Sequence, residues 1–275
     1  MASPTGPGRT VDQCLIRHPH HAGGRRRPAE STARPGLPDA AAVPAPSCGG
    51  RRPVAAVFRA LAALTGVTGI VLDTIDSHDL GRLFSYFTIQ SNILLVLVFA
   101  WSAHRAWTGR PALSPRITGA ALLYICITGL VFHFVLSNDS SGFSMTSHRT
   151  PVESVASQLL HTATPLAAVL DRILFTAPGA FLFRYAWQWL VYPILYLPFA
   201  LIRGALLAPG TDGRYPYPFL DVDLHGYAGI ATNAAVFALA FYALALALVL
   251  LDRIRPRRRG PGGRMPSTGS GPLDA

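Results

Sequence analysis

Apolar stretches separated by short polar segments dominate the chain from residue 54 onward. A helix needs about 20 residues to cross the hydrocarbon core of a bilayer, and each of six stretches is close to that length or longer. They cover residues 54–72, 83–103, 117–136, 152–174, 181–207 and 226–251. The pattern predicts an all-α membrane protein, a six-transmembrane-helix bundle over residues 53–252 without a separate soluble domain.

Two of these stretches differ from a uniformly apolar helix. Residues 152–174 form the least hydrophobic stretch, and such polarity suits a helix inside a bundle rather than one facing lipid. Residues 181–207 form a long stretch that contains Pro193 and Pro198. Proline removes a backbone donor and clashes with the preceding turn, so a kink is expected there.

The two ends of the chain have a different composition. Residues 1–52 and 253–275 are rich in proline, glycine and arginine and show no apolar periodicity. Such segments bury too little apolar surface to offset the loss of chain entropy on folding. Both are therefore predicted to be disordered tails, and the first lacks the apolar core of a signal peptide.

The number and positions of the charged residues further limit which class of protein the chain can belong to. Half of the 275 residues are hydrophobic and only 14% are charged, whereas about a quarter are charged in a soluble domain. The net charge of +10 comes from 24 basic residues, all of them arginine. These arginines flank apolar stretches, so membrane lipids are the expected partners and nucleic acid is not.

The arginines also predict an orientation. With the N-terminus inside the cell, all but four of the 24 arginines lie on the inner side. The four exceptions are Arg82, Arg149, Arg203 and Arg214. Because cytoplasmic loops carry the excess of positive charge, we expect a multi-pass protein of the cell inner membrane with both termini in the cytoplasm.

Two polar helix faces suggest a site. Residues at spacings of three and four share one side of a helix. One such set is Ser85, Thr88, Ser91 and Asn92, and the other is Gln158, His161, Thr162 and Pro165. Polar side chains are costly in hydrocarbon, so both sets are expected to face protein. Our central hypothesis is that the two faces meet and that Thr88 pairs with His161.

That pair has the chemistry of acyl transfer. A threonine hydroxyl becomes a nucleophile when a base such as neutral histidine takes its proton. Donors from Gln90, Ser91 and Asn92 would stabilise the oxyanion. His133 and Gln158 would line the same outward-facing pocket. The motifs of soluble serine hydrolases and zinc proteases, GxSxG and HExxH, are absent from the sequence.

Other interpretations of these residues remain open. Threonine on a membrane helix commonly bonds a backbone carbonyl or a neighbouring helix. His133, His161, His225 and Asp221 or Asp223 would form a zinc site if the helices gathered them, although their spacing is irregular. A lipid-binding or transport protein without catalysis is the third possibility. No cofactor is expected.

Several short motifs resemble a known family. In chain order they are Tyr86-Phe87-Thr88-Ile89-Gln90-Ser91-Asn92, Leu160-His161-Thr162-Ala163-Thr164-Pro165-Leu166 with Asp171, Tyr192-Pro193 with Tyr196, Arg203-Gly204, and Tyr215-Pro216-Tyr217-Pro218-Phe219-Leu220-Asp221-Val222. They are similar to bacterial six-span membrane proteins related to the eukaryotic androgen-induced, FAR-17a-like family, over roughly residues 54–252.

The resemblance implies an intramembrane threonine hydrolase of fatty acid esters of hydroxy fatty acids. Thr88 matches the family's nucleophile and His161 its base. Ile89 departs from the eukaryotic pattern, which has an aromatic residue at this position. The segment Tyr215–Phe219 belongs to the bacterial branch and is expected to be extended, stiffened by Pro216 and Pro218.

Overall fold

The computed structural model describes residues 50–77, 79–145 and 150–256. Within these ranges every regular element is helical. In chain order they are α1 (Pro53–Asp76), α2 (Leu80–Leu83), α3 (Phe87–Trp107), α4 (Pro115–Val131), η1 (Phe132–Leu136), α5 (Pro151–Gln158), η2 (Leu159–Ala163), α6 (Thr164–Phe175), α7 (Phe183–Trp189), α8 (Val191–Leu206), η3 (Pro218–Leu220) and α9 (Val222–Ile254). The predicted tails lie almost wholly outside the described residues.

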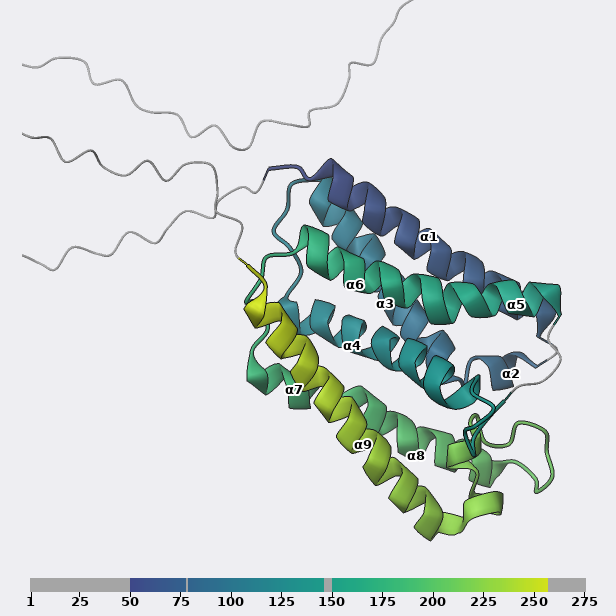
Figure 1. Ribbon diagram of the computed structural model, residues 1–275. Helices are drawn as coiled ribbons and strands as arrows, with labels where there is room; N and C mark the ends of the chain where they lie inside the picture. The colour runs from purple at the N-terminus through teal and green to yellow at the C-terminus, as the bar shows by residue number, and fades with distance from the viewer. Residues whose placement is uncertain (1–49, 78, 146–149, 257–275) are drawn as a thin grey trace, which may run out of the picture. The chain divides into compact units, whose positions relative to one another are not determined.

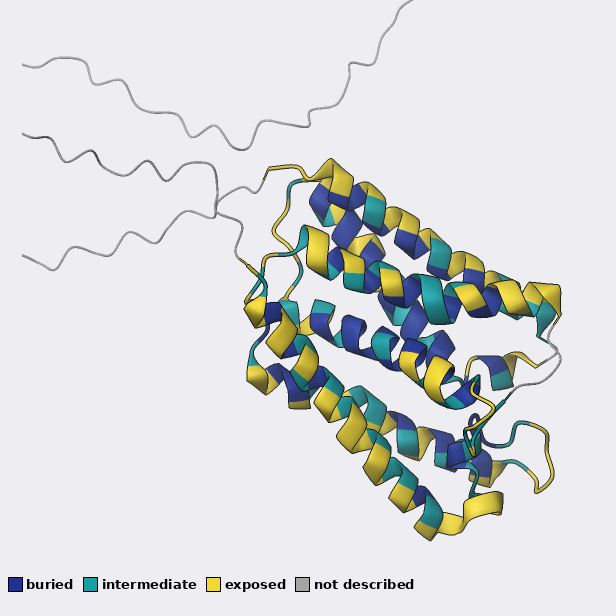
Figure 2. Cartoon of the chain, in the orientation of Figure 1, coloured by how far each residue is buried: buried dark blue, intermediate teal, exposed yellow. Residues whose placement is uncertain are grey.

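Helix α4 occupies the centre of the bundle. It packs on α3 and α6 on one side and on α7 and α9 on the other, as Figure 1 shows. Of its apolar segment 61% is buried, compared with 11% for α9, and Figure 2 shows the exposed outer surface of α9. The core therefore lies around α4, with α9 at the periphery.

Within the described ranges, five helical segments are long and apolar enough to cross a membrane. They are Pro53–Asp76, Phe87–Trp107, Pro115–Leu136, Phe183–Leu206 and Val222–Ile254. Many large apolar side chains on their outer surfaces are exposed, among them Leu61, Leu206 and Leu239. Exposed apolar surface on this scale is typical of contact with lipid, which indicates a membrane protein. The predicted fold class, an all-α membrane protein, is thus confirmed.

The least hydrophobic predicted span is helical as well. Residues 151–175 form a continuous helix through α5, η2 and α6, but they are not among the five segments apolar enough to qualify as spans. The helix packs on α1 and α4. Ser157, Thr164 and Asp171 on this helix are buried against protein, whereas Ser154 and Gln158 are exposed.

One helix break and one helix kink lie at a proline and at a glycine. Pro193 has no N–H to donate to the carbonyl of Trp189, four residues earlier, and α7 ends at Trp189 while α8 begins at Val191. Helix α8 then continues through Pro198 to Leu206. In α9, Gly226 adopts φ 62° and ψ 171°, a conformation open mainly to glycine, and makes a kink near the predicted start of the last span.

Small residues let α1 lie close against its neighbours. Its buried positions are Ala55, Ala56, Arg59, Ala62, Ala63, Gly66 and Gly69. A Cβ at Gly66 would come within 2.7 Å of Val96 of α3, and one at Gly69 within 2.7 Å of Leu160 of η2. Small residues at helix contacts let membrane helices approach closely, so α1 supports both helices that carry the candidate site.

A buried ion pair joins α1 to α6. Arg59 Nε donates to Asp171 Oδ1 at 2.7 Å and Nη2 donates to Oδ2 at 3.3 Å. The two side chains are only 6% and 11% exposed. Asp171, which the sequence marks only as part of a motif, therefore has a structural partner on the first helix.

Replacing Asp171 with asparagine is expected to lower the free energy of unfolding by about 3 kcal/mol, because it leaves the charge of Arg59 buried without its partner. Thermal unfolding of the purified protein in detergent would measure the loss. Asp212→Asn is the matched control, since Asp212 pairs with Arg82 while 90% exposed, and exposed pairs contribute about 1 kcal/mol or less. Equal shifts for the two variants would contradict the structural role of the Arg59–Asp171 pair.

Candidate active site

Thr88 and His161 meet, as the sequence hypothesis requires. Thr88 lies in the first turn of α3, and His161 lies in η2. The Thr88 Oγ1 atom is 3.2 Å from His161 Nε2. This distance is within the range expected for a nucleophile and its base, although the residues are 73 positions apart along the chain.

The hydrogen bond on the other side of the ring fixes the tautomer. His161 Nδ1 is 3.0 Å from the backbone carbonyl oxygen of Ser157. A carbonyl oxygen can only accept, so in the neutral ring Nδ1 carries the hydrogen. The Nε2 lone pair then faces Thr88 and accepts its hydroxyl hydrogen, which is the direction of transfer that a general base needs.

A π-helical turn presents His161 to α3. Pro165 has no N–H to donate to the carbonyl of His161, four residues earlier, and the helix widens into η2 over Leu159–Ala163. A Cβ at Gly129 of α4 would lie 3.1 Å from that carbonyl oxygen, so glycine lets α4 approach here. The Phe132 ring stacks on the His161 ring with centroids 4.0 Å apart, which holds the imidazole in place.

Tyr217 completes the site, and its role does not follow from the pattern of polar and apolar residues. Its phenolic oxygen accepts from the Thr88 backbone N–H at 3.3 Å and lies 3.4 Å from Thr88 Oγ1. Since the Thr88 hydroxyl hydrogen points to His161, the Tyr217 hydroxyl donates to Oγ1. Burial raises the pKa of the Tyr217 phenol to about 12, so it remains a donor near neutral pH.

Hydrogen bonds and close packing hold the loop before α9 in the position that brings Tyr217 to Thr88. Arg203 Nη1 donates to the carbonyls of Gly213 and Arg214 at 3.0 and 2.9 Å. Arg214 Nε donates back to the Gly204 carbonyl at 2.7 Å. A Cβ at Gly204 would lie 2.1 Å from the Tyr215 ring. The motifs Arg203-Gly204 and Tyr215–Phe219 thus form one packed unit, in which Tyr215 and Tyr217 are buried.

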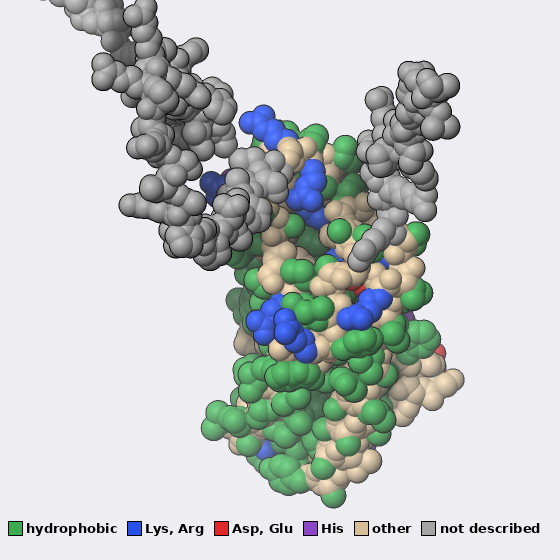
Figure 3. All heavy atoms as spheres, turned by 90° about the vertical axis from the view of Figure 1, so that its left-hand side faces the viewer, with side chains coloured by type: hydrophobic (Ala, Val, Ile, Leu, Met, Phe, Trp, Pro, Cys, Tyr) green, Lys and Arg blue, Asp and Glu red, His purple; other side chains and the backbone are tan. Residues whose placement is uncertain are grey.

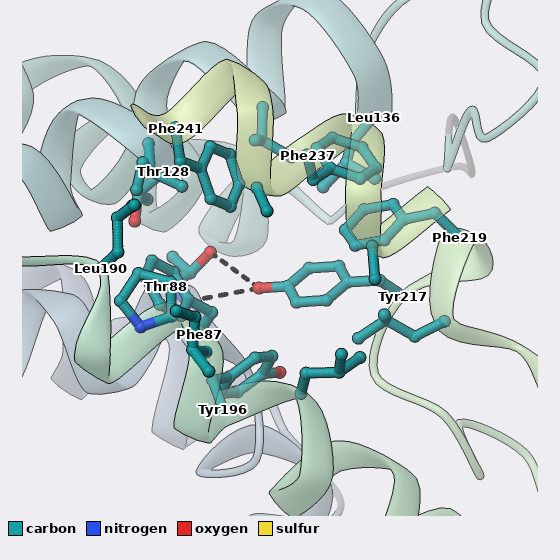
Figure 4. A pocket seen from close by; sticks show the side chains of 18 residues that line it. Phe87, Thr88, Thr128, Leu136, Leu190, Tyr196, Tyr217, Phe219, Phe237 and Phe241 are labelled. Carbon is teal, nitrogen blue, oxygen red and sulfur yellow. Dashed lines mark hydrogen bonds between the residues drawn. The ribbon is translucent and has the colours of Figure 1, made fainter. Parts of the chain in front are cut away.

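Thr88 and Tyr217 open on an apolar cavity of about 150 Å³. Figure 4 shows Tyr217 pointing across it to Thr88, with Phe219, Phe237 and Phe241 among the surrounding side chains. Its lining residues are Phe87, Thr88, Ile127, Thr128, Val131, Leu136, Leu190, Pro193, Ile194, Tyr196, Leu197, Tyr217, Phe219, Leu220, Ala234, Phe237, Ala238 and Phe241. The cavity is suited to a hydrocarbon group close to the Thr88 hydroxyl.

The predicted oxyanion donors have other roles. Asn92 Nδ2 donates to the carbonyls of Thr88 and Leu160 at 2.9 and 3.2 Å, while its oxygen accepts from Thr164 at 2.7 Å. Gln90 donates to the Phe84 carbonyl and accepts from Tyr192. Ser91 Oγ is buried and has no bonding partner among the described residues. None of the three lines the cavity, so the structure does not bring these side chains to it, and their role as oxyanion donors stays a prediction.

His133 and Gln158 also lie outside the cavity. Both are exposed, and both bond to Thr162: His133 Nε2 lies 3.0 Å from Thr162 Oγ1, which donates to Gln158 Oε1 at 3.1 Å. They therefore form a separate polar chain beside η2. Their prediction as pocket residues is corrected, because the side of the helix that carries Thr162 differs from the side that presents His161 to Thr88.

The predicted zinc ligands do not gather. His161 faces Thr88, His133 faces Thr162, and His225 lies against the Phe143 ring at 5.6 Å. Asp221 accepts from the Asp223 N–H at the start of α9, and Asp223 pairs with Arg214. Over the ranges that the structure covers, no group of three or more His, Cys, Asp or Glu side chains is placed to hold a metal ion. This ligand set is therefore wrong.

Comparisons with family models, curated proteins and solved structures found no match to the chain.

Proposed function

We propose that the protein is an integral membrane hydrolase that cleaves lipid esters, with Thr88 as nucleophile and His161 as general base. The observation that carries the proposal is the directional chain from the Tyr217 hydroxyl through Thr88 Oγ1 to His161 Nε2, with Nδ1 bonded to the Ser157 carbonyl. Tyr217 and Thr88, at the start of this chain, line an apolar cavity. An activated hydroxyl beside a hydrocarbon-sized space suits an acyl substrate.

In the first step, Thr88 Oγ1 attacks the ester carbonyl carbon while its proton moves to His161 Nε2. The carbonyl oxygen takes up the negative charge. Tyr217 then donates to this oxyanion instead of to Oγ1, near the positive end of the α3 helix dipole. The intermediate collapses, the ester C–O bond breaks, and the alcohol leaves with the proton held by His161.

In the second step, His161 takes a proton from water, and the resulting hydroxide attacks the acyl carbon on Thr88. The bond between this carbon and Oγ1 breaks, Thr88 recovers its proton from His161, and the fatty acid leaves. His161 thus acts as base and acid in both halves, while the Ser157 carbonyl keeps the tautomer fixed. The two reaction steps require no cofactor.

The membrane arrangement belongs to the same proposal. The helix from Pro151 to Phe175 crosses the bilayer as a sixth span, packed on α1 and α4. In the predicted orientation all but four of the 24 arginines lie on the cytoplasmic side, and the site lies toward the outer side. We also propose membership of the family that the motifs resemble, since Thr88 and His161 are the residues that meet.

The experiment is a hydrolysis assay of purified protein in detergent micelles with fluorogenic esters of increasing acyl length. The cavity predicts that kcat/KM rises with each added methylene until the apolar space is filled, by about fourfold per group if each contributes ~0.8 kcal/mol. An acetyl ester is the matched control, because it leaves the cavity empty. Equal rates for acetyl and longer esters would contradict a substrate held by this cavity.

The apolar cavity alone also favours a second function, binding of a lipid without cleavage. The hydrolysis assay distinguishes lipid binding from ester cleavage. An ester recovered intact from a folded protein that binds it saturably would favour lipid binding over hydrolysis.

A further inference from the structure

A second cavity, of about 200 Å³, lies between α1, α3, α4 and α6. Ser102, in its wall, follows Thr88 by four turns of α3, about 20 Å along the helix at 1.5 Å per residue. We propose that this cavity binds the phosphate group of an anionic phospholipid. The inference does not depend on hydrolysis at Thr88.

The cavity has more positive than negative charge. Arg52, Arg59 and Arg172 line it, and Asp171 is the single carboxylate among its lining residues. Asp171 is held by both Nε and Nη2 of Arg59. Among the ion pairs of the described residues none involves Arg52. The charge of Arg52 is therefore available to an anion.

Arg172 adds a donor that lacks an acceptor. Its Nη2 bonds Asp252, which also pairs with Arg255 at 3.5 Å. Its Nε is buried and has no hydrogen-bond partner within the described part of the chain. Buried donors are nearly always paired in folded proteins. A phosphate in the cavity would accept hydrogen bonds from the guanidinium groups that line it, which bind phosphate through paired N–H donors.

Most of the remaining wall is apolar, which points to a lipid rather than a free anion. Leu95, Val98, Phe99, Leu122 and Phe175 lie beside the arginines in the same cavity. An inorganic phosphate would leave these side chains unfilled. A phospholipid would place its phosphate against the guanidinium groups and its glycerol and first acyl carbons against the apolar wall.

The surroundings of the cavity match the depth of lipid headgroups. Other arginines lie at the same end of the helices, near the start of α1 and α4, the end of α3 and α9, and in α7: Arg51, Arg116, Arg105, Arg253 and Arg184. Figure 3 shows arginine side chains on this face, beside broad hydrophobic surface. Arginine clusters at the edge of membrane helices attract anionic lipids.

Isothermal titration of the full-length protein in neutral detergent tests the site with dioctanoyl phosphatidylglycerol. We expect saturable binding that Arg52→Gln weakens about tenfold, because one charge-assisted contact is lost. Arg51→Gln is the matched control: it removes the same charge one residue away, and Arg51 does not line the cavity. It should change the affinity by less than about twofold. Thr88→Val should leave binding unchanged.

Inorganic phosphate and dioctanoylglycerol identify the part of the lipid that is recognised. Weak binding of both supports a phospholipid site. Phosphate that binds as tightly as the lipid and depends equally on Arg52 would overturn the lipid assignment in favour of a free anion. Dioctanoylglycerol that binds as tightly would overturn the role of the phosphate. Absent binding, or equal losses in Arg51→Gln and Arg52→Gln, would overturn the site.

Discussion

Thr88→Val is expected to reduce ester hydrolysis at least ~10³-fold in kcat/KM, since removal of a nucleophile leaves only binding and electrostatic contributions. Valine keeps the shape of threonine and removes only the hydroxyl, so the cavity and the packing of α3 should be preserved. The rate is measured on purified protein in detergent with a long-chain fluorogenic ester, together with the melting temperature.

Thr128→Val provides the matched control for this variant. Thr128 lines the same cavity, but its hydroxyl donates to the Tyr124 carbonyl of its own helix at 3.1 Å. The same isosteric change should therefore alter kcat/KM by less than about threefold. Comparable losses for Thr88→Val and Thr128→Val would show that the cavity, not the Thr88 hydroxyl, determines the rate.

Tyr217→Phe is expected to reduce kcat about 10²-fold while KM changes little, because the phenol stabilises charge that develops only in the transition state. The variant keeps the ring that stacks on Phe219, whose centroid lies 5.1 Å away. Steady-state kinetics on the same ester would separate the effect on kcat from the effect on KM.

The effect of Tyr217→Phe should also be constant with pH. Burial raises the pKa of the Tyr217 phenol to about 12, so the hydroxyl keeps its proton from pH ~6 to ~10. Tyr196→Phe is the matched control: Tyr196 lines the same cavity but donates to the Ser85 carbonyl. A larger loss of kcat in Tyr196→Phe than in Tyr217→Phe would contradict a role for Tyr217 beside the oxyanion.

Periodicity along the chain was enough to predict the pairing of Thr88 with His161. Spacings of three and four place each residue on the polar side of its helix, and the cost of unpaired polar groups in hydrocarbon makes two such sides meet. The same rule predicted that Asn92 faces protein. Periodicity did not predict that Asn92 forms hydrogen bonds with the Leu160 carbonyl and with Thr164 across the helix interface. It shows toward which side of a helix a residue points, but not which residue of the neighbouring helix it contacts.

Two features of the site could not be predicted from periodicity, because they depend on turns and on contacts between distant parts of the chain. Tyr217 lies 129 residues after Thr88, in a non-helical loop that the apolar pattern does not address. Only its two flanking prolines marked the segment as rigid. The widened turn η2 likewise determines which neighbours its residues contact: Thr162 contacts His133, whereas His161 contacts Thr88. A single proline one turn later, Pro165, was the only local signal for it.

The most direct measurement is covalent labelling of the purified protein with a fluorophosphonate probe, followed by mass spectrometry of its peptides. An activated Thr88 hydroxyl predicts one phosphonylated site, at Thr88, that disappears in Thr88→Val and persists in Thr128→Val. A folded protein that binds the probe's alkyl chain but carries no label, or carries it on another residue, would contradict nucleophilic catalysis by Thr88.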